Sequence, residues 1–448
     1  MDNQYITILD YVLLPFVLLI IYGIAYRYRN KHYGPKHPWR KYFIPALSVK
    51  VFGAIFIGLI YQYYYGGGDT FNFFNHAKII NSAFNESGWK WLNLLLHIPH
   101  LSDGNYYEYI SRLPWYTDTS SYTIASIAAF FGIFTFNTYL PATVLFAALS
   151  FTGVWALFRT FAAKYPAYIQ PVAIAILFIP STFVWGSGIF KDTICLFGLG
   201  WLTYGTFRFL IQKDFSIRNI LLATISFLLI VNIKVYILLG FIPALLLWIL
   251  FLYLEKVRSK SGKFLLRIIF LAVSITIFLV FMQQFGNDLG KYSLEEIART
   301  SELTRGWIGY VSEVQDGASY DLGAIDPSIG GMLLKFPAAI NVTLFRPYIW
   351  EAGKPIVMLS AIEALFFLII TIKLFFSLGL KKIWLTISAD PTIQFCLIFS
   401  LIFAFAVGIS TSNFGALSRY KIPCLSFYLL ALLLIYYKNK SAKLFVFI

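Results

Sequence analysis

The chain has 448 residues, of which 59% are hydrophobic and only 13% are charged. Soluble domains carry about 25% charged residues, so this composition excludes a protein whose surface mostly faces water. Apolar runs long enough to cross a hydrocarbon core of about 30 Å recur along the whole length. Backbone groups in lipid must bond internally, which makes these runs helices. The sequence therefore predicts an all-α polytopic membrane protein with one transmembrane domain over residues 1–448.

The net charge of +15 is explained by topology rather than by a nucleic-acid partner, because the basic residues cluster in short loops between the apolar runs. Lys and Arg in such loops mark the cytoplasmic side of a membrane. The three cysteines lie in or beside apolar runs and lack CxxC spacing. They are therefore expected to be small buried hydrophobes, namely Cys195, Cys396 and Cys424.

The first apolar run, 9–26, fixes the predicted orientation. Its basic flank, from Arg27 to Lys41, follows it, which places its C-terminal end in the cytoplasm and the N-terminus outside. Alternation from this anchor predicts about eleven spans, and the inner segments hold 22 of the 36 Lys and Arg residues. The membrane is expected to be a bacterial inner membrane. The expected spans are 9–26, 44–64, 138–158, 168–184, 193–210, 218–231, 235–253, 264–282, 356–376, 391–409 and 422–437.

Three stretches fall outside this alternation. If 122–134 were counted as a span, it would invert the charge pattern of everything after it, so a re-entrant or interfacial helix is predicted there. Segments 65–121 and 283–354 are large, polar and net acidic. They are predicted to be two extracytoplasmic loops, the first of them containing interfacial helices.

The candidate chemistry gathers at the outer ends of the spans, where ionisable residues are costly and therefore informative. Asp69 follows three glycines in Tyr-Tyr-Tyr-Gly-Gly-Gly-Asp-Thr, which let the backbone turn sharply and approach a ligand closely. A carboxylate at such a turn suits a general base that acts on a hydroxyl. The residue also fits a helix N-cap, and the two roles are compatible.

A second candidate motif follows Pro180, in Trp185-Gly-Ser-Gly-Ile-Phe-Lys191-Asp192. Lys191 is expected to contact a phosphate. Asp192 is expected to orient that phosphate or the hydroxyl group of an acceptor molecule. The structural alternative is a capped helix start with a lysine that extends to the membrane surface. Lys234, in a very short outer turn, is a further phosphate-binding candidate or an interfacial anchor.

Two arginines lie at outer span boundaries, where the positive-inside rule does not place them. Arg346 lies in Phe-Arg-Pro-Tyr-Ile-Trp-Glu, and Arg419 lies in Arg-Tyr-Lys at the start of the last span. A guanidinium offers planar, bidentate donors suited to phosphate, so both are predicted to bind phosphate. Aromatic residues beside Arg346 suit either the interfacial belt of a membrane or stacking on a sugar ring. Contacts with a sugar or with an acceptor molecule are expected from Trp185, Trp350, Glu351 and Tyr420.

No metal site is assigned, although a divalent metal stays open as a cofactor. His97, His100 and Asp103 have a spacing that could hold a metal. The surrounding stretch 89–100 is more typical of a helix on the membrane surface.

Together these motifs resemble the GT-C type of integral-membrane glycosyltransferase. The resemblance rests on Gly-Asp69-Thr, Trp185-x-Ser187-x-x-x-Lys191-Asp192, Phe-Arg346-Pro with Trp350-Glu351, and Arg419-Tyr420. It implies a polyprenyl-phosphate sugar, or a polyprenyl-diphosphate glycan, as donor, and a glycan, lipid or protein as acceptor. The reaction is then expected on the non-cytoplasmic face, as part of the making of a cell-envelope polysaccharide.

The resemblance assigns Asp69 to catalysis, as the base that removes a proton from the acceptor hydroxyl. The cations at the same level would offset charge that develops on the leaving phosphate. Two other functions stay open. One is an O-antigen-type polymerase or ligase, which also takes polyprenyl-diphosphate glycans at outer arginines. The other is a lipid-glycan flippase or transporter, a class that places polar residues at mid-membrane.

Overall fold

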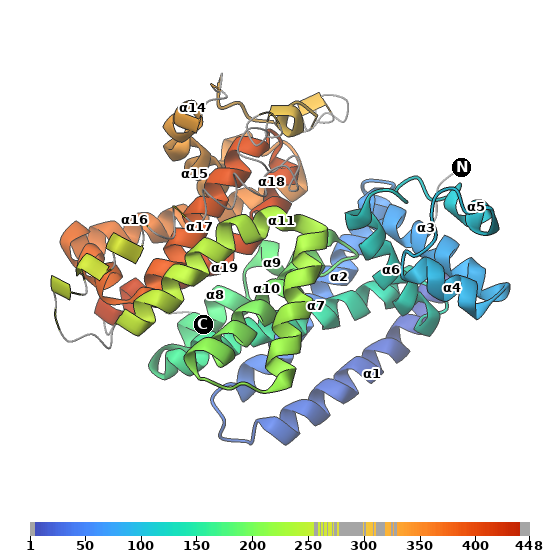
Figure 1. Ribbon diagram of the computed structural model, residues 1–448, viewed down its shortest axis with the longest axis horizontal. Helices are drawn as coiled ribbons and strands as arrows, with labels where there is room; N and C mark the ends of the chain where they lie inside the picture. Colours follow the sequence, from blue (N-terminus) through green and yellow to red (C-terminus); the bar gives the residue numbers. More distant parts are fainter. Residues whose placement is uncertain are drawn as a thin grey trace. The chain divides into compact units, whose positions relative to one another are not determined.

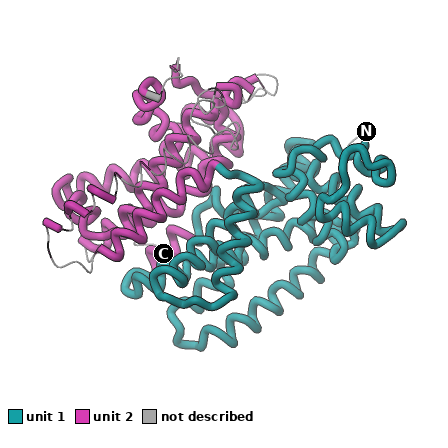
Figure 2. Tube along the Cα trace, in the orientation of Figure 1, with its two compact units in different colours: residues 1–169, 177–235 teal, residues 170–176, 236–448 magenta. Residues whose placement is uncertain are grey.

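The computed structural model describes residues 5–254 and 329–439, with some of residues 259–326 between them. Figure 1 shows that the regular elements of this part of the chain are helices, which confirms the all-α class. The chain divides into two compact units (Figure 2). Unit 1 is Met1–Ile169 with Leu177–Val235, and unit 2 is Gln170–Ile176 with Tyr236–Ile448. The expected single transmembrane domain stays a prediction.

Eight helices in the described part of the chain are long and apolar enough to cross a membrane, as expected of a polytopic membrane protein. Most of the predicted spans coincide with one of them, whereas the count of eleven stays a prediction. The eight are α1 (Ile8–His32), α2 (Arg40–Tyr63), α7 (Tyr139–Lys164), α10 with its π-helical end η4 (Lys191–Ile211), α11 (Ile217–Leu254), α16 (Pro355–Ala389), α17 (Pro391–Ser410) and α19 (Ile422–Asn439).

Two predicted spans have no single helix as a counterpart among the residues that the structure describes. Residues 168–184 form the short helices α8 (Ile169–Leu177) and α9 (Pro180–Val184), because a proline cannot continue a helix but readily begins one. Neither helix is long enough to cross a membrane. The stretch 264–282 lies largely outside the described residues.

The predicted outer segment 65–121 is mostly helical, and α6 (Thr119–Phe134) follows it. With 16 residues at about 1.5 Å each, α6 is shorter than the hydrocarbon core, and its re-entrant or interfacial position stays a prediction. Much of the predicted loop 283–354 lies outside the described residues. The elements of 65–121 are α3 (Asp69–Ser82), η1 (Ala83–Asn85), α4 (Gly88–Leu95), η2 (Gly104–Tyr106) and α5 (Tyr107–Ile110).

Helix α7 forms the centre of unit 1 and packs against α1, α2 and α10. Its Gly153 lets α10 approach until the two backbones touch. A Cβ added to Gly200 of α10 would lie 1.9 Å from the Gly153 carbonyl oxygen. Small residues at such a crossing are the usual means by which membrane helices pack closely. Helix α1 lies at the edge of unit 1 (Figure 1).

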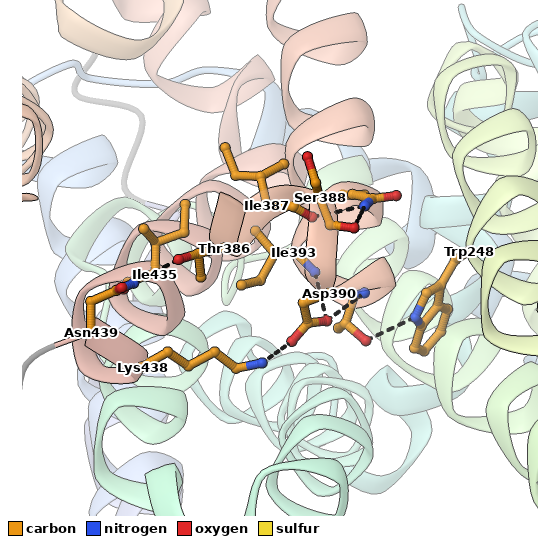
Figure 3. Close-up of polar contacts among 11 residues, drawn as sticks. Trp248, Thr386, Ile387, Ser388, Asp390, Ile393, Ile435, Lys438 and Asn439 are labelled. Atoms are coloured by element: carbon orange, nitrogen blue, oxygen red, sulfur yellow. Dashed lines mark hydrogen bonds and ion pairs between the residues drawn. The ribbon is translucent and has the colours of Figure 1, made fainter. Parts of the chain in front are cut away.

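In unit 2, Asp390 links the end of α16 to the start of α17 (Figure 3). Its Oδ1 accepts hydrogen bonds from the backbone N–H of Thr392 at 2.8 Å and of Ile393 at 3.3 Å, which is the geometry of an N-cap. Its Oδ2 forms an ion pair with Lys438 near the end of α19. The indole of Trp248 donates to the Thr392 hydroxyl at 2.9 Å. The other helices of unit 2 include α14 (Ile329–Leu334), α15 (Phe336–Phe345) and α18 (Phe414–Tyr420).

Candidate functional site

Unit 1 brings together four charged residues of the predicted site and one that the sequence analysis did not single out. Lys191 donates to the Ser120 hydroxyl at 2.6 Å, and its ammonium lies 3.3 Å from Asp118 Oδ2. Asp69 and Lys234 lie close enough to interact electrostatically with Lys191. Lys234 Nζ in turn lies 2.5 Å from Asp192 Oδ1. We call these five residues the charged cluster: Asp69, Asp118, Lys191, Asp192 and Lys234.

The glycine turn before Asp69 forms as the sequence predicts. Gly68 has φ +134°, a conformation that side chains rarely adopt, and a Cβ there would lie 2.5 Å from the Tyr61 ring. The expected N-cap role of Asp69 is wrong, because Gly68 is the N-cap of α3. Asp69 instead lies in the first turn of that helix. A carboxylate there is favoured by the helix dipole. Asp69 is exposed, whereas Thr70 beside it is buried and hydrogen-bonds the Tyr139 hydroxyl at 2.7 Å.

Asp118 is the N-cap of α6 and was missed because Asp-Thr-Ser-Ser is an ordinary start of a helix. Partial burial raises the pKa of this carboxyl. Hydrogen bonds from Ser121 and Ser120, with the nearby Lys191 ammonium, overcome that effect and hold the pKa of Asp118 well below its usual range. Asp118 is therefore ionised at neutral pH and keeps the Lys191 side chain in place.

Asp192 and Lys234 form the most deeply buried ion pair of the charged cluster. Their side chains are only 2% and 9% exposed. Lys234 is also the point at which α11 leaves helical geometry, with φ −147° and ψ 73°. The predicted turn between spans 218–231 and 235–253 thus corresponds to a kink, and the lysine at that kink points to a buried carboxylate rather than serving as a surface anchor.

A lysine that the sequence analysis overlooked supports the loop before α10. Lys50 lies inside α2, is 2% exposed, and donates to the backbone oxygens of Gly186 at 2.5 Å and Thr182 at 3.3 Å. Ser150 donates to the same Gly186 oxygen at 2.9 Å. The available signal was a lone charge within an apolar run, which is costly and seldom without a role. Trp185 in this loop is buried at 5% exposure, so its predicted contact with a sugar stays a prediction.

The remaining predicted site residues belong to unit 2. Arg346 and Glu351 form an ion pair, with Arg346 Nε 3.0 Å from Glu351 Oε2. Hydrogen bonding to Glu351 raises the pKa of Arg346. Burial raises the pKa of Glu351, but hydrogen bonds from Arg346 and from the Tyr348 N–H outweigh burial, so the pKa of Glu351 lies below its usual value. The guanidinium also lies 5.4 Å from the centre of the Phe414 ring. Trp350 is 82% exposed, and Arg419 and Tyr420 are half-buried at the end of α18.

The predicted convergence of Asp69 with Arg346 and Arg419 stays a prediction, because these residues belong to different units. Among the described residues, no group of three or more His, Cys, Asp or Glu side chains could hold a metal ion. His97 packs instead, with its ring stacked 4.0 Å from that of Tyr122.

Comparison with protein-family models, curated proteins and solved structures found no match to this chain. The fold defines an all-helical membrane protein with several spans. A function has to be argued from the site itself, because a fold alone does not imply one.

Proposed function

We propose that this chain is a glycosyltransferase that moves a sugar from a polyprenyl-phosphate-linked donor to an acceptor hydroxyl on the extracytoplasmic face. The observation that carries the proposal is an exposed carboxylate on a glycine turn, Asp69, within electrostatic range of the Lys191 ammonium. Lys191 is the first residue of a membrane span. A lipid-linked sugar phosphate presents its anion at this level, where spans meet the headgroups.

In the proposed reaction the acceptor oxygen attacks the anomeric carbon. The bond between that carbon and the phosphate oxygen breaks, and the polyprenyl phosphate leaves with the bonding electrons. The acceptor proton passes to the Asp69 carboxylate, which acts as general base. Lys191 offsets the charge that develops on the leaving phosphate. In-line attack of this kind inverts the anomeric centre.

The other charged residues of unit 1 have supporting roles in this proposal. Asp118 stays ionised and orients Lys191. The pair Asp192–Lys234 is too deeply buried to contact a substrate directly, but Asp192 follows Lys191 in the first turn of α10. We therefore assign the pair a positioning role for that turn. In unit 2, Arg346 and Arg419 stay candidates for phosphate binding, and Trp350 is an exposed aromatic suited to a sugar ring.

The test uses the full chain in lipid nanodiscs with a panel of radiolabelled undecaprenyl-phosphate hexoses. We expect Asp69→Asn to lower transfer by about 10²- to 10⁴-fold, the usual contribution of a general base. Glu86→Gln is the matched control, because Glu86 is an exposed acid of the same outer segment that pairs with Lys90. Its activity should be unchanged. Equal transfer by the wild type and Asp69→Asn would refute the proposed base.

A deletion strain separates the transferase from its closest alternative. Undecorated polymer should accumulate if the chain adds a sugar. Loss of polymer length instead would favour an O-antigen-type polymerase or ligase.

A further inference from the structure

A cavity of about 280 Å³ opens in unit 1, and none of the described residues that line it is acidic. It lies at the end of α7 and α10 opposite to the charged cluster. On α7, Tyr139 contacts Thr70 beside Asp69, whereas Arg159 lies in the cavity twenty residues later. At about 1.5 Å per residue this separation is about 30 Å, the thickness of a hydrocarbon core. The cavity and the charged cluster therefore belong to opposite membrane faces.

The two guanidinium groups in the cavity retain hydrogen-bonding capacity. Arg159 stacks on Tyr204, with its guanidinium carbon 4.2 Å from the ring centre. Arg208 donates to Gln212 at 2.6 Å and forms an ion pair with Asp214. In both arginines the buried Nε atom has no hydrogen-bond partner among the described residues. Buried donors are nearly always satisfied, so two unpartnered donors on arginines that line one cavity point to an acceptor from a ligand.

The backbone around Arg208 is a second, independent indication of a site. Residues Phe207–Ile211 form a π-helix at the end of α10. Such segments are rare and occur frequently at functional sites. The aromatic lining, which includes Tyr28, Tyr33 and Trp39, offers apolar surface beside the two cations.

From this geometry we infer that the cavity binds a phosphate group carried by a lipid headgroup. Arginine forks match phosphate oxygens in shape and charge. The cavity lies where membrane spans end, which is the level of the headgroups. Helices α1 and α7 also end here, and helix C-termini carry partial negative charge that already offsets part of the arginine charge. This favours a phosphate monoester or diester over a nucleoside triphosphate. The inference does not rest on the proposed glycosyl transfer.

The test is native mass spectrometry of the full chain in detergent with phosphatidylglycerol, and with diacylglycerol of the same acyl chains as the phosphate-free probe. We expect the wild type to retain phosphatidylglycerol in preference to diacylglycerol. Arg159→Gln should weaken that binding at least about 10-fold. Lys164→Gln is the matched control, because Lys164 lies on the same helix, carries the same charge and does not line the cavity. Its binding should equal that of the wild type.

Arg159→Lys guards against a folding defect, since it keeps the charge over Tyr204 but loses the planar fork. It should also bind phosphatidylglycerol more weakly. In a second experiment, inorganic phosphate in the millimolar range competes with the bound lipid. If it displaces the lipid, the phosphate group is the feature that the cavity recognises. Binding of inorganic phosphate but not of phosphatidylglycerol would overturn the lipid source. Equal retention of both lipids, or equal binding by Arg159→Gln and Lys164→Gln, would overturn the site.

Discussion

Two lysine–aspartate ion pairs, one in each unit, use the same chemistry for different purposes. In unit 1, Lys234 and Asp192 are both nearly inaccessible, at 9% and 2% exposure. In unit 2, the Lys438 side chain is 29% exposed, and Asp390 also caps α17 (Figure 3). The second pair is accounted for by helix capping and by the link between α17 and α19. The first lies at the kink of α11, beside the proposed site, so the comparison sets a pair with a proposed positioning role against an architectural one.

The largest effect is expected from breaking the buried pair of unit 1. Lys234→Met leaves the Asp192 carboxylate buried without its cation. We expect this to lower the free energy of unfolding by about 3–5 kcal/mol. Thermal unfolding of the full chain in detergent should show this loss, and Asp192→Asn combined with Lys234→Met should recover a good part of it. If the double variant is as unstable as Lys234→Met, the two side chains are not coupled and the comparison fails.

A smaller effect is expected in unit 2. Asp390→Ala removes the N-cap of α17 and the pairing with Lys438, and should cost about 1–2 kcal/mol. Asp390→Asn retains a capping oxygen and loses only the ion pair, and an ion pair with a partly exposed lysine contributes little. Its loss of stability should therefore be only a few tenths of the loss for Asp390→Ala. The same unfolding assay measures both variants. A larger loss for Asp390→Asn than for Asp390→Ala would contradict the capping role.

The smallest effect concerns Asp118 and pH. Its folded-state pKa is depressed, so the stability it contributes is present above the unfolded pKa of about 3.9 and is lost as the pH falls through the folded value. The difference in stability between the wild type and Asp118→Asn should therefore be the same at pH 8 and pH 5. It should be under about 1 kcal/mol, because the side chain is 48% exposed. A difference that shrinks between pH 8 and pH 5 would show that Asp118 titrates in that range.

Much of the fold could be predicted from the sequence, because membrane spans are governed by length and hydropathy. The apolar runs located helices such as α7 and α17 closely. The run 168–184 misled the prediction, because its hydropathy continues through Pro180 while its helix does not. The kink at Lys234 was visible only as a short polar interruption, and the partner of this lysine is a carboxylate 42 residues away.

The candidate site was less predictable for a related reason. Asp69, Lys191 and Asp192 were identified because each lies at a span boundary. Asp118 and Lys50 were missed because their roles come from tertiary contacts: one meets Lys191 across 73 residues, and the other meets Gly186 across 136. Nothing in the local sequence specifies such partners. Lone charges within apolar runs were the signal that deserved more weight.

The contact between Gly153 of α7 and Gly200 of α10 has a mechanical consequence. Helices packed this closely resist sliding past each other, so we expect α7 and α10 to move together. These two helices carry Lys191 at one end and the cavity arginines, Arg159 and Arg208, at the other. A tilt of this helix pair that moves one of these ends is therefore expected to move the other end as well.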